Sequence, residues 1–303
     1  MKVGLVESNG VSTVLLQAGS DRIDFSKAYQ AYRLVVENLA TEPVRAVGEL
    51  LRAGTMTVTF FAKVLTFLDK HALRERYRLP EPTGYLLPFR PGKVICLGRN
   101  YAAHAAETGA KIPEEPVIFS KSPDSCIGDG EPILTRESYG RVDYEAELAF
   151  VVGRRARYVA EDEAADYIAG YTIFNDVTAR GIQQADIGQG LPWFRSKSID
   201  TFGPMGPVIA LPDEMPWPVE VDIELRVNGV VRQQSNTSKF LFTIPNVLSY
   251  ITRFMTLEPG DVVSTGTPDG ISAIAPGDMI EITIPQIGVL KNPVAPSRAR
   301  TLR

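Results

Sequence analysis

The stretch Asp143-Tyr-Glu-Ala-Glu-Leu-Ala-Phe150 alternates in side-chain character from one residue to the next. This alternation predicts a β-strand, because successive side chains of a strand point to opposite faces of its sheet. One predicted face carries Tyr144, Ala146, Leu148 and Phe150, and the other carries Glu145, Glu147, Ala149 and Val151. Two carboxylates therefore emerge from one face, one pleat repeat apart.

Two carboxylates placed this close repel each other, and each is hard to remove from water. A divalent cation would offset both effects, and a set of oxygen ligands favours a hard ion such as Mg²⁺, Mn²⁺ or Ca²⁺. Asp176 ends a second predicted strand, residues 171–176, and would complete a site of three carboxylates. The alternative is a solvent-facing strand edge that carries two ordinary surface glutamates, since the E-x-E pattern is common.

The composition of the 303-residue chain narrows the choice of metal and of partner. The chain has only two histidines, His71 and His104, so a zinc site built from histidine and cysteine is nearly excluded. The net charge is −4 with both signs mixed along the chain, which gives no indication of nucleic acid or an anionic membrane as partner. Cys96 and Cys126 could form one disulfide, but a reduced setting is favoured. The chain shows neither the apolar run of a signal peptide nor that of a membrane span, and we expect a cytoplasmic protein.

The pattern along the chain predicts a small N-terminal α+β domain over residues 1–90 and a larger, β-rich domain over residues 91–303. Prolines cluster between residues 80 and 91, as is typical of a connector. Apolar periodicity and turn signals predict helices over residues 26–40, 58–76, 161–169 and 244–255, a hairpin at Asn228-Gly229, and a last strong strand at residues 279–284. In the helix over residues 244–255, Phe254 is expected on the buried side.

A short alanine-rich helix is predicted directly after the buried strand at residues 94–98. His104 and Glu107 lie three residues apart on it, so they share one face and can reach each other. A carboxylate beside an imidazole can orient the ring and raise its basicity, as a general base requires. The alternative is a surface ion pair. Lys197 is the one cation that we expect near the carboxylates, although a lysine considered alone is more often a surface residue.

Several motifs in this order resemble the fumarylacetoacetate hydrolase family over about residues 92–295. They are G-R-N-Y-A-x-H-x-x-E at 98–107, Y-E-A-E-L at 144–148, N-D-V-T-A-R at 175–180, K-S at 197–198, R-V-N-G at 226–229 and T-L-E-P-G-D-V-V-S-T-G-T-P at 256–268. The resemblance implies an α+β, β-rich fold, a mixed β-sandwich roll with a small N-terminal α+β domain, and a homodimer.

The resemblance also implies roles for the residues that match these motifs. Glu145, Glu147 and Asp176 are similar to the family's Mg²⁺ or Mn²⁺ ligands, and His104, Glu107 and Lys197 to its catalytic residues. The implied substrate-binding residues are Arg99, Tyr101, Arg180, Gln183 and Thr267. Gly181 departs from the family pattern, since many relatives have an acidic residue there, and this leaves any supporting role of that position in doubt.

The implied function is a divalent-metal-dependent hydrolase that cleaves the C–C bond of a β-diketo 2-oxo acid, of the acylpyruvate or fumarylpyruvate type. Three other reactions could use the same metal site: decarboxylation of oxaloacetate, isomerisation of a 2-hydroxy-diene dioate, and dehydration of a 2-keto-3-deoxy sugar acid. A metal-dependent binding protein without turnover is the alternative from a different class. The segment 188–193 and the N-terminal domain are the candidates for a lid over the site.

Overall fold

A ten-stranded mixed sheet forms the centre of the molecule. The computed structural model of the chain describes residues 1–297. Nine strands follow one another across this sheet: β3 (Asp21–Asp24), β2 (Val11–Ala18), β1 (Lys2–Ser8), β12 (Gly203–Ala210), β10 (Ile168–Asn175), β9 (Ala146–Val152), β15 (Val262–Ser264), β4 (Val94–Gly98) and β5 (Val117–Lys121). The tenth strand, β6 (Cys126–Ile127), pairs with β12 in parallel.

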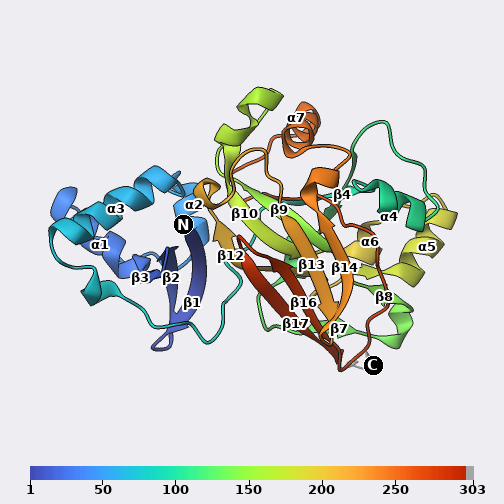
Figure 1. Ribbon diagram of the computed structural model, residues 1–303, viewed down its shortest axis with the longest axis horizontal. Coiled ribbons are helices and arrows are strands. Elements are labelled where there is room, and N and C mark those ends of the chain that lie inside the picture. The colour runs from blue at the N-terminus through green and yellow to red at the C-terminus, as the bar shows by residue number, and fades with distance from the viewer. Residues whose placement is uncertain (298–303) are drawn as a thin grey trace, which may run out of the picture.

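A second sheet of five strands packs against the first, and together they form the sandwich seen in Figure 1. Its strands are, in order, β14 (Val230–Asn236), β13 (Asp222–Val227), β16 (Met279–Ile284), β17 (Gly288–Pro296) and β7 (Ile133–Thr135), and a separate two-stranded sheet pairs β11 (Thr178–Ala179) with β8 (Val142–Asp143). The predicted α+β, β-rich sandwich is thus confirmed. The strand β17 was not predicted from the sequence.

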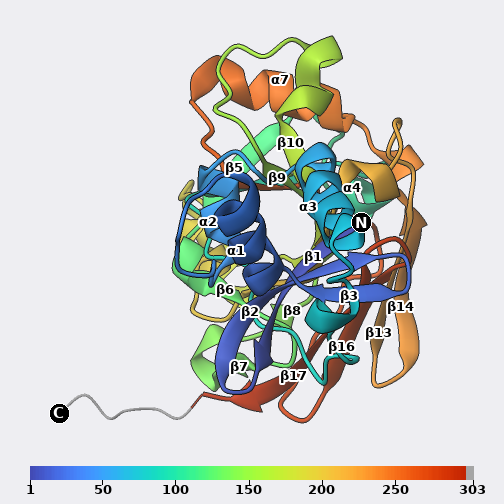
Figure 2. The same cartoon turned by 90° about the vertical axis from the view of Figure 1, so that its left-hand side faces the viewer.

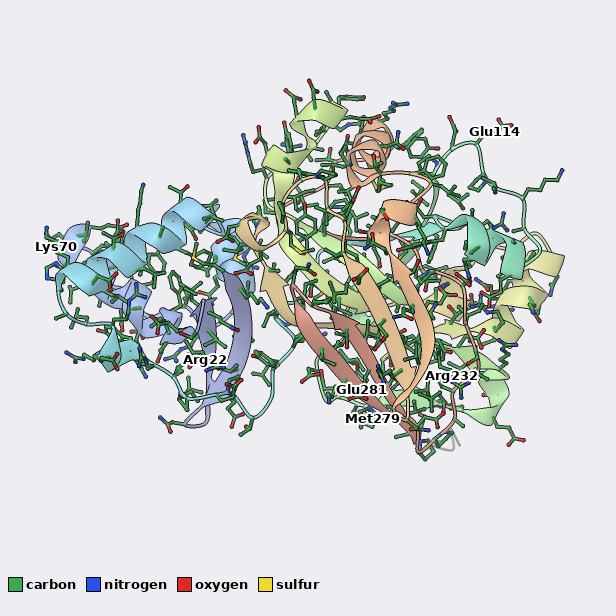
Figure 3. The ribbon with its side chains drawn as sticks, in the orientation of Figure 1. Arg22, Lys70, Glu114, Arg232, Met279 and Glu281 are labelled. Atoms are coloured by element: carbon green, nitrogen blue, oxygen red, sulfur yellow. The ribbon has the colours of Figure 1, made fainter. Side chains whose placement is uncertain are left out.

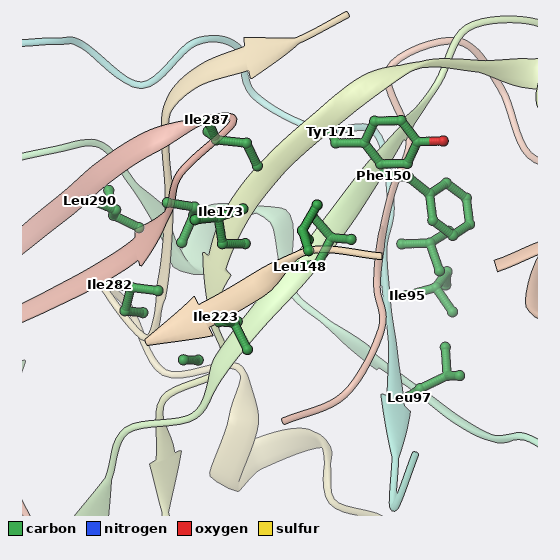
Figure 4. Close-up of a cluster of buried hydrophobic side chains, with 14 of the residues drawn as sticks. Ile95, Leu97, Leu148, Phe150, Tyr171, Ile173, Ile223, Ile282, Ile287 and Leu290 are labelled. Carbon is green, nitrogen blue, oxygen red and sulfur yellow. The ribbon is translucent and has the colours of Figure 1, made fainter. Parts of the chain in front are cut away.

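The stretch 143–150, which predicted a strand, forms part of the central strand β9 from Ala146 onward, whereas Asp143 lies in β8 and Tyr144 and Glu145 lie between the two strands. The alternation of side chains along this stretch separates two apolar cores. Tyr144, Leu148 and Phe150 point into the core between the two sheets, which Figure 4 shows around Leu148 and Phe150. Ala149 and Val151 point into a second core, on the side of the N-terminal helices. Both faces of β9 are therefore buried, and a charged side chain on this strand needs its own partners.

The first three strands extend the large sheet, because β1 pairs with β12 in antiparallel fashion. Three helices lie beside them at one end of the molecule, as Figures 1 and 2 show: α1 (Phe25–Val36), α2 (Val47–Arg52) and α3 (Val58–Lys70). Aromatic rings of α1 and α3 pack edge to face, with the centroids of Phe25 and Phe61 4.7 Å apart. These contacts join the two helices to each other.

The other helices are α4 (Ala102–Glu107), α5 (Arg180–Gly188), α6 (Phe194–Lys197) and α7 (Ile244–Phe254), with 3-10 turns at η1 (Glu75–Tyr77), η2 (Pro123–Ser125), η3 (Glu137–Tyr139), η4 (Glu161–Tyr167), η5 (Pro212–Glu214) and η6 (Thr237–Lys239). Within residues 1–297, no helix combines the length and the apolar character that crossing a membrane requires.

All four helix predictions from apolar periodicity and turn signals were wrong in part. Helix α1 ends at Val36 rather than residue 40. Helix α3 ends at Lys70 rather than residue 76, because Ala72 adopts a left-handed backbone conformation (φ 54°). Residues 161–167 form a 3-10 turn, and the chain then enters β10. Gly170 lies within that strand, where a Cβ atom would meet the Ala210 carbonyl oxygen, so this glycine serves close strand packing rather than a helix end. Phe254 is exposed and not buried.

Two phenylalanines allow a matched test of the second core. Phe61 is 0% exposed within the N-terminal aromatic cluster, whereas Phe254 is 61% exposed on α7. Phe61→Ala should lower the free energy of unfolding by about 3–5 kcal/mol, because it removes a buried ring and leaves a cavity. Phe254→Ala should lower it by about 1 kcal/mol or less. Urea unfolding of both variants measures the difference, and equal losses would contradict the assigned burial.

Candidate active site

Three buried carboxylates lie close together where β9 begins and the neighbouring strand β10 ends. Glu147 lies in β9, Glu145 directly precedes it, and Asp176 directly follows β10. The Asp176 backbone N–H donates to the Glu145 carbonyl oxygen at 2.9 Å, which holds the two strand ends together. One oxygen from each carboxylate lies within 4.8 Å of the others. The three predicted metal ligands are thus brought together.

Two buried lysines neutralise part of this negative charge. Lys197 of α6 donates from Nζ to Glu145 at 2.7 Å and to Asp176 at 2.5 Å. Lys121, at the end of β5, donates to the other Asp176 oxygen at 2.7 Å. Burial lowers the pKa of Lys197, but the charges of Asp176 and Glu145 outweigh it and raise the pKa above its usual value. The role of Lys121 was missed, because its pairing with Asp176 joins residues that are 55 positions apart in the chain.

Arg180 pairs with the remaining oxygen of Glu145 and with a fourth acid. It donates from Nη2 to Glu145 at 2.5 Å, from Nε to Asp143 at 2.9 Å, and from Nη1 to Gln183 at 2.6 Å. Arg180 and Gln183 lie three residues apart on α5, and therefore face the site together. Burial raises the pKa of Glu145, but Lys197 and Arg180 outweigh this and hold it below its usual value. Asp143 was missed, although it begins the alternating stretch.

Glu147 is different, because no cationic side chain within residues 1–297 pairs with it. It accepts hydrogen bonds only from the Ser264 hydroxyl, at 2.5 Å, and the Gly266 backbone N–H, at 2.8 Å. Burial, together with the charges of Asp176 and Glu145, raises the pKa of Glu147 well above its usual value. A buried, crowded carboxylate of this kind requires a proton or a cation. The oxygen-only donor set fits a hard divalent ion.

The predicted dyad is present beside these acids. His104 Nδ1 and Glu107 Oε2 lie 3.3 Å apart on α4. The other oxygen of Glu107 accepts the Gly270 backbone N–H at 3.0 Å, so the carboxylate is held by a second segment of the chain. Because Nδ1 faces Glu107, the second ring nitrogen of His104, Nε2, is left for other partners.

A cavity of about 510 Å³ unites most of the predicted residues. The predicted residues that line it are Arg99, His104, Glu107, Glu145, Glu147, Arg180, Gln183, Lys197 and Thr267. Asp176 is buried behind this surface. Tyr101 is also buried and does not line the cavity, since its ring packs against Phe240 with centroids 5.1 Å apart.

The sequence did not predict the aromatic wall of the cavity, although Trp193 belongs to the segment 188–193 that was named as a candidate lid. This wall consists of Phe119 and Trp193, whose ring centroids are 5.4 Å apart. A Cβ atom at position 98 would lie 2.8 Å from the Trp193 ring, so the absence of a side chain at Gly98 admits this packing. No residue before Leu97 is among those that line the cavity. The N-terminal helices lie away from the cavity. In Figure 3, Lys70 at the end of α3 and Glu114 after α4 lie at opposite ends of the molecule.

Comparison with known proteins agrees with this architecture. Residues 93–295 match the model of the fumarylacetoacetate (FAA) hydrolase C-terminal domain. The chain belongs to the fumarylacetoacetate hydrolase family. A solved structure of this family, the fumarylacetoacetate hydrolase of Exiguobacterium antarcticum, is 32% identical with a TM-score of 0.80, and the alignment covers 98% of this chain and 100% of that one.

Two further relatives of this fumarylacetoacetate hydrolase family member are named by their activity. The fumarylpyruvate hydrolase of Pseudomonas aeruginosa, solved in complex with Mn²⁺ and pyruvate, is 30% identical with a TM-score of 0.66, over 72% of this chain and 94% of that one. The oxaloacetate tautomerase of Bacillus subtilis is 40% identical over 68% of this chain and 70% of its own length. The family therefore includes different reactions, and the exact reaction does not follow from membership.

If the three carboxylates hold a divalent ion, loss of one charge should abolish tight binding. Glu147→Gln should weaken Mn²⁺ affinity by about 100-fold or more, because it removes the one carboxylate without a cationic partner. Glu107→Gln is the matched control and should bind Mn²⁺ as the parent protein does, since Glu107 hydrogen-bonds His104 rather than the acidic cluster. Isothermal titration calorimetry measures both affinities, and an unaltered Glu147→Gln variant would contradict this site.

Metal binding should also release a proton. The raised pKa of Glu147 means that the metal-free protein keeps this carboxyl protonated to higher pH than an ordinary glutamate. Mn²⁺ binding requires the ionised form, so Mn²⁺ affinity should fall as the pH is lowered through that raised pKa. Calorimetry in two buffers of different ionisation enthalpy counts the released protons. A binding enthalpy that is the same in both buffers would count against a protonated Glu147.

Proposed function

We propose that this protein is a divalent-metal-dependent hydrolase that cleaves the C–C bond of a β-diketo 2-oxo acid, such as an acylpyruvate or fumarylpyruvate. The observation that supports this most directly is the sharing of one cavity by the His104–Glu107 dyad and the carboxylates Glu145 and Glu147. A hydrolase needs both a site for the 2-oxo acid and a base for water, and this cavity offers both.

Glu145, Glu147 and Asp176 would hold the Mg²⁺ or Mn²⁺ ion. The bound ion would polarise the 2-oxo acid and stabilise the negative charge that develops on its ketone oxygen. Lys197 adds positive charge beside the same carboxylates, and Thr267 offers a hydroxyl on the cavity wall. Arg180 and Gln183 would keep Glu145 in place and contact the polar end of the substrate.

The dyad would supply the nucleophile. His104, oriented by Glu107, takes a proton from water, and the resulting hydroxide attacks the carbonyl carbon farther from the carboxylate. The C–C bond between that carbon and its neighbour on the ketone side then breaks, and its electron pair forms an enolate. Proton transfer to the enolate carbon yields a carboxylic acid and a 2-oxo acid of the pyruvate type. His104 is a suitable proton carrier for this last transfer.

Keto–enol tautomerisation of oxaloacetate is the second candidate, since the Bacillus subtilis relative carries that name. It needs only proton transfer and no attacking water. The volume of about 510 Å³ favours a longer substrate, because a four-carbon acid would leave much of the cavity unfilled. Decarboxylation, diene dioate isomerisation, sugar acid dehydration and binding without turnover are further alternatives on the same acidic site.

We also propose that residues 91–303 form the catalytic domain and residues 1–90 a supporting one. Every residue that lines the cavity falls between Leu97 and Ile271, and the family match begins at residue 93. A homodimer and a cytoplasmic location stay predictions from the resemblance and the composition.

The two histidines of the chain provide the test of the hydrolytic step. His104→Ala should lower the kcat for an acylpyruvate by about 10²–10⁴-fold, the range expected for loss of a general base. His71→Ala, on the exposed end of α3, is the matched control and should retain the parent kcat. Mn²⁺ affinity should be preserved in both variants.

Turnover is measured over a panel with metal and then with EDTA. The panel contains an acylpyruvate, fumarylpyruvate, oxaloacetate, a 2-hydroxy-diene dioate and a 2-keto-3-deoxy sugar acid. If the His104→Ala variant hydrolysed the acylpyruvate at the parent rate, His104 would not be the base. Turnover of oxaloacetate alone would favour the tautomerase or decarboxylase alternatives, and no turnover with metal bound would favour a binding protein.

A further inference from the structure

Gln233 is a buried amide on a strand whose other residues are exposed or half-buried. It lies in β14, at the edge of the second sheet, and its exposed fraction is 1%. A buried amide that leaves a donor or an acceptor unpaired costs free energy, so such a side chain is normally hydrogen-bonded at both ends. Gln233 meets this condition through three partners, Ala146, Thr267 and Pro268, which lie at or beside residues of the candidate active site.

Two backbone groups fix the orientation of the Gln233 amide. Its Oε1 accepts the backbone N–H of Ala146, between Glu145 and Glu147, at 3.0 Å, and its Nε2 donates to the carbonyl oxygen of Pro268 at 2.8 Å. A backbone N–H can only donate and a carbonyl oxygen can only accept, so these partners decide which end of the amide is oxygen and which is nitrogen. The remaining N–H of Nε2 therefore donates to Thr267 Oγ1, 2.9 Å away.

This bond decides where the proton of the Thr267 hydroxyl can go. The hydroxyl cannot donate back to Gln233, because an amide nitrogen is not an acceptor. Within residues 1–297, the Thr267 hydroxyl has no other hydrogen-bond partner, and Thr267 lines the cavity. Its proton is therefore free for an acceptor in the cavity. An anionic group such as a carboxylate, which accepts and does not donate, matches a proton presented in this way.

Strand β14 also supports the far end of the same turn, residues 267–270. The Gly270 backbone N–H donates to Glu107 of the dyad at 3.0 Å. Gly270 has a φ of 97°, a conformation that favours glycine, and a Cβ atom there would meet the carbonyl oxygen of Arg232, directly before Gln233. The turn thus contacts β14 at both of its ends, and Gln233 anchors the end that carries Thr267.

We propose that Gln233 is a positioning residue, whose amide holds the Thr267 hydroxyl with its proton directed into the cavity, where it donates to an anionic group of the ligand. Gln233 is not among the residues that line the cavity, so it acts through Thr267. That the anionic group is the carboxylate of a 2-oxo acid rests on the proposed function. The alternative is a structural role alone, in which Gln233 joins β14 to β9 through Ala146.

A double-mutant cycle between Gln233 and Thr267 separates these two roles. Gln233→Met removes the amide and introduces no charge, and Thr267→Val removes the hydroxyl and keeps a branched side chain. Gln234→Met is the matched control, since Gln234 is the next residue of β14, is exposed and does not line the cavity. The probe is pyruvate, which carries one carboxylate beside a ketone and requires no turnover in order to bind.

Calorimetry with Mn²⁺ present measures the pyruvate affinity of each variant. Gln233→Met should weaken it by about tenfold, as expected for loss of a hydrogen bond to a charged group, and Gln234→Met by less than about twofold. In the Thr267→Val protein, Gln233→Met should weaken it by about twofold or less, because the hydroxyl through which it acts is already absent. Equal losses in the two backgrounds would show a structural role alone and overturn the proposal, as would a parent protein that does not bind pyruvate.

Gln233→Glu provides a second cycle in case Gln233→Met does not fold. Its carboxylate keeps an acceptor for the Ala146 N–H, and when ionised it accepts the Thr267 proton instead of donating to the hydroxyl. Repulsion between the new charge and pyruvate is common to both backgrounds and cancels in the cycle. The loss of pyruvate affinity should again be about tenfold greater with Thr267 than with Thr267→Val, and additive losses would overturn the proposal. Mn²⁺ affinity that is not weakened shows that the acidic cluster is intact.

Turnover distinguishes this role of Gln233 from the proposed function. The kcat/KM for an acylpyruvate should fall by about tenfold in Gln233→Met, and by much less when Thr267→Val is already present. If acylpyruvates are hydrolysed and the two losses are additive, the hydrolase stands and the role of Gln233 falls. If no acylpyruvate is hydrolysed but the pyruvate affinities show the coupling, the hydrolase falls and the role of Gln233 stands.

Discussion

Burial of like charges within a few ångströms is the constraint on which this structure depends. Glu145, Glu147 and Asp176 approach within 4.8 Å of one another under the surface, where mutual repulsion and loss of water both oppose ionisation. Lys197, Lys121 and Arg180 offset two of these carboxylates. The third, Glu147, lacks a cationic partner within residues 1–297, and this unequal compensation is the reason why we expect a cation to bind here.

The sheets make this crowding possible. Strand β9 has both faces covered, so its Glu147 cannot turn away to solvent, and its pairing with β10 brings Asp176 beside Glu145, which directly precedes β9. The helices α5 and α6 and the end of β5 then surround the same strand ends, as the contacts of α6 with β5 and of α5 with α6 show. Residues from these five segments converge because tertiary packing, rather than proximity in the chain, sets their positions.

The cavity divides into parts that perform different tasks. In the proposed reaction, the acids and their lysines would stabilise negative charge on a 2-oxo acid, and the dyad beside them would supply a base for water. Phe119 and Trp193 form an aromatic part of the cavity wall, and the Arg99 guanidinium carbon lies 5.7 Å from the centroid of the Trp193 ring. One cavity thus unites the acidic cluster, the dyad and an aromatic wall.

The local sequence pattern predicted those features of the structure that depend on residues close together in the chain. The period of residues 143–150 predicted the strand β9 and its two faces, and the spacing of His104 and Glu107 predicted their contact, because both follow from backbone geometry alone. Only the tertiary structure decided which charges pair. Lys121 reaches Asp176 across 55 positions, and Arg180 joins Asp143 across 37, so neither pairing leaves a local trace. Phe254 shows the converse, since its helical position was compatible with burial but its side chain is 61% exposed.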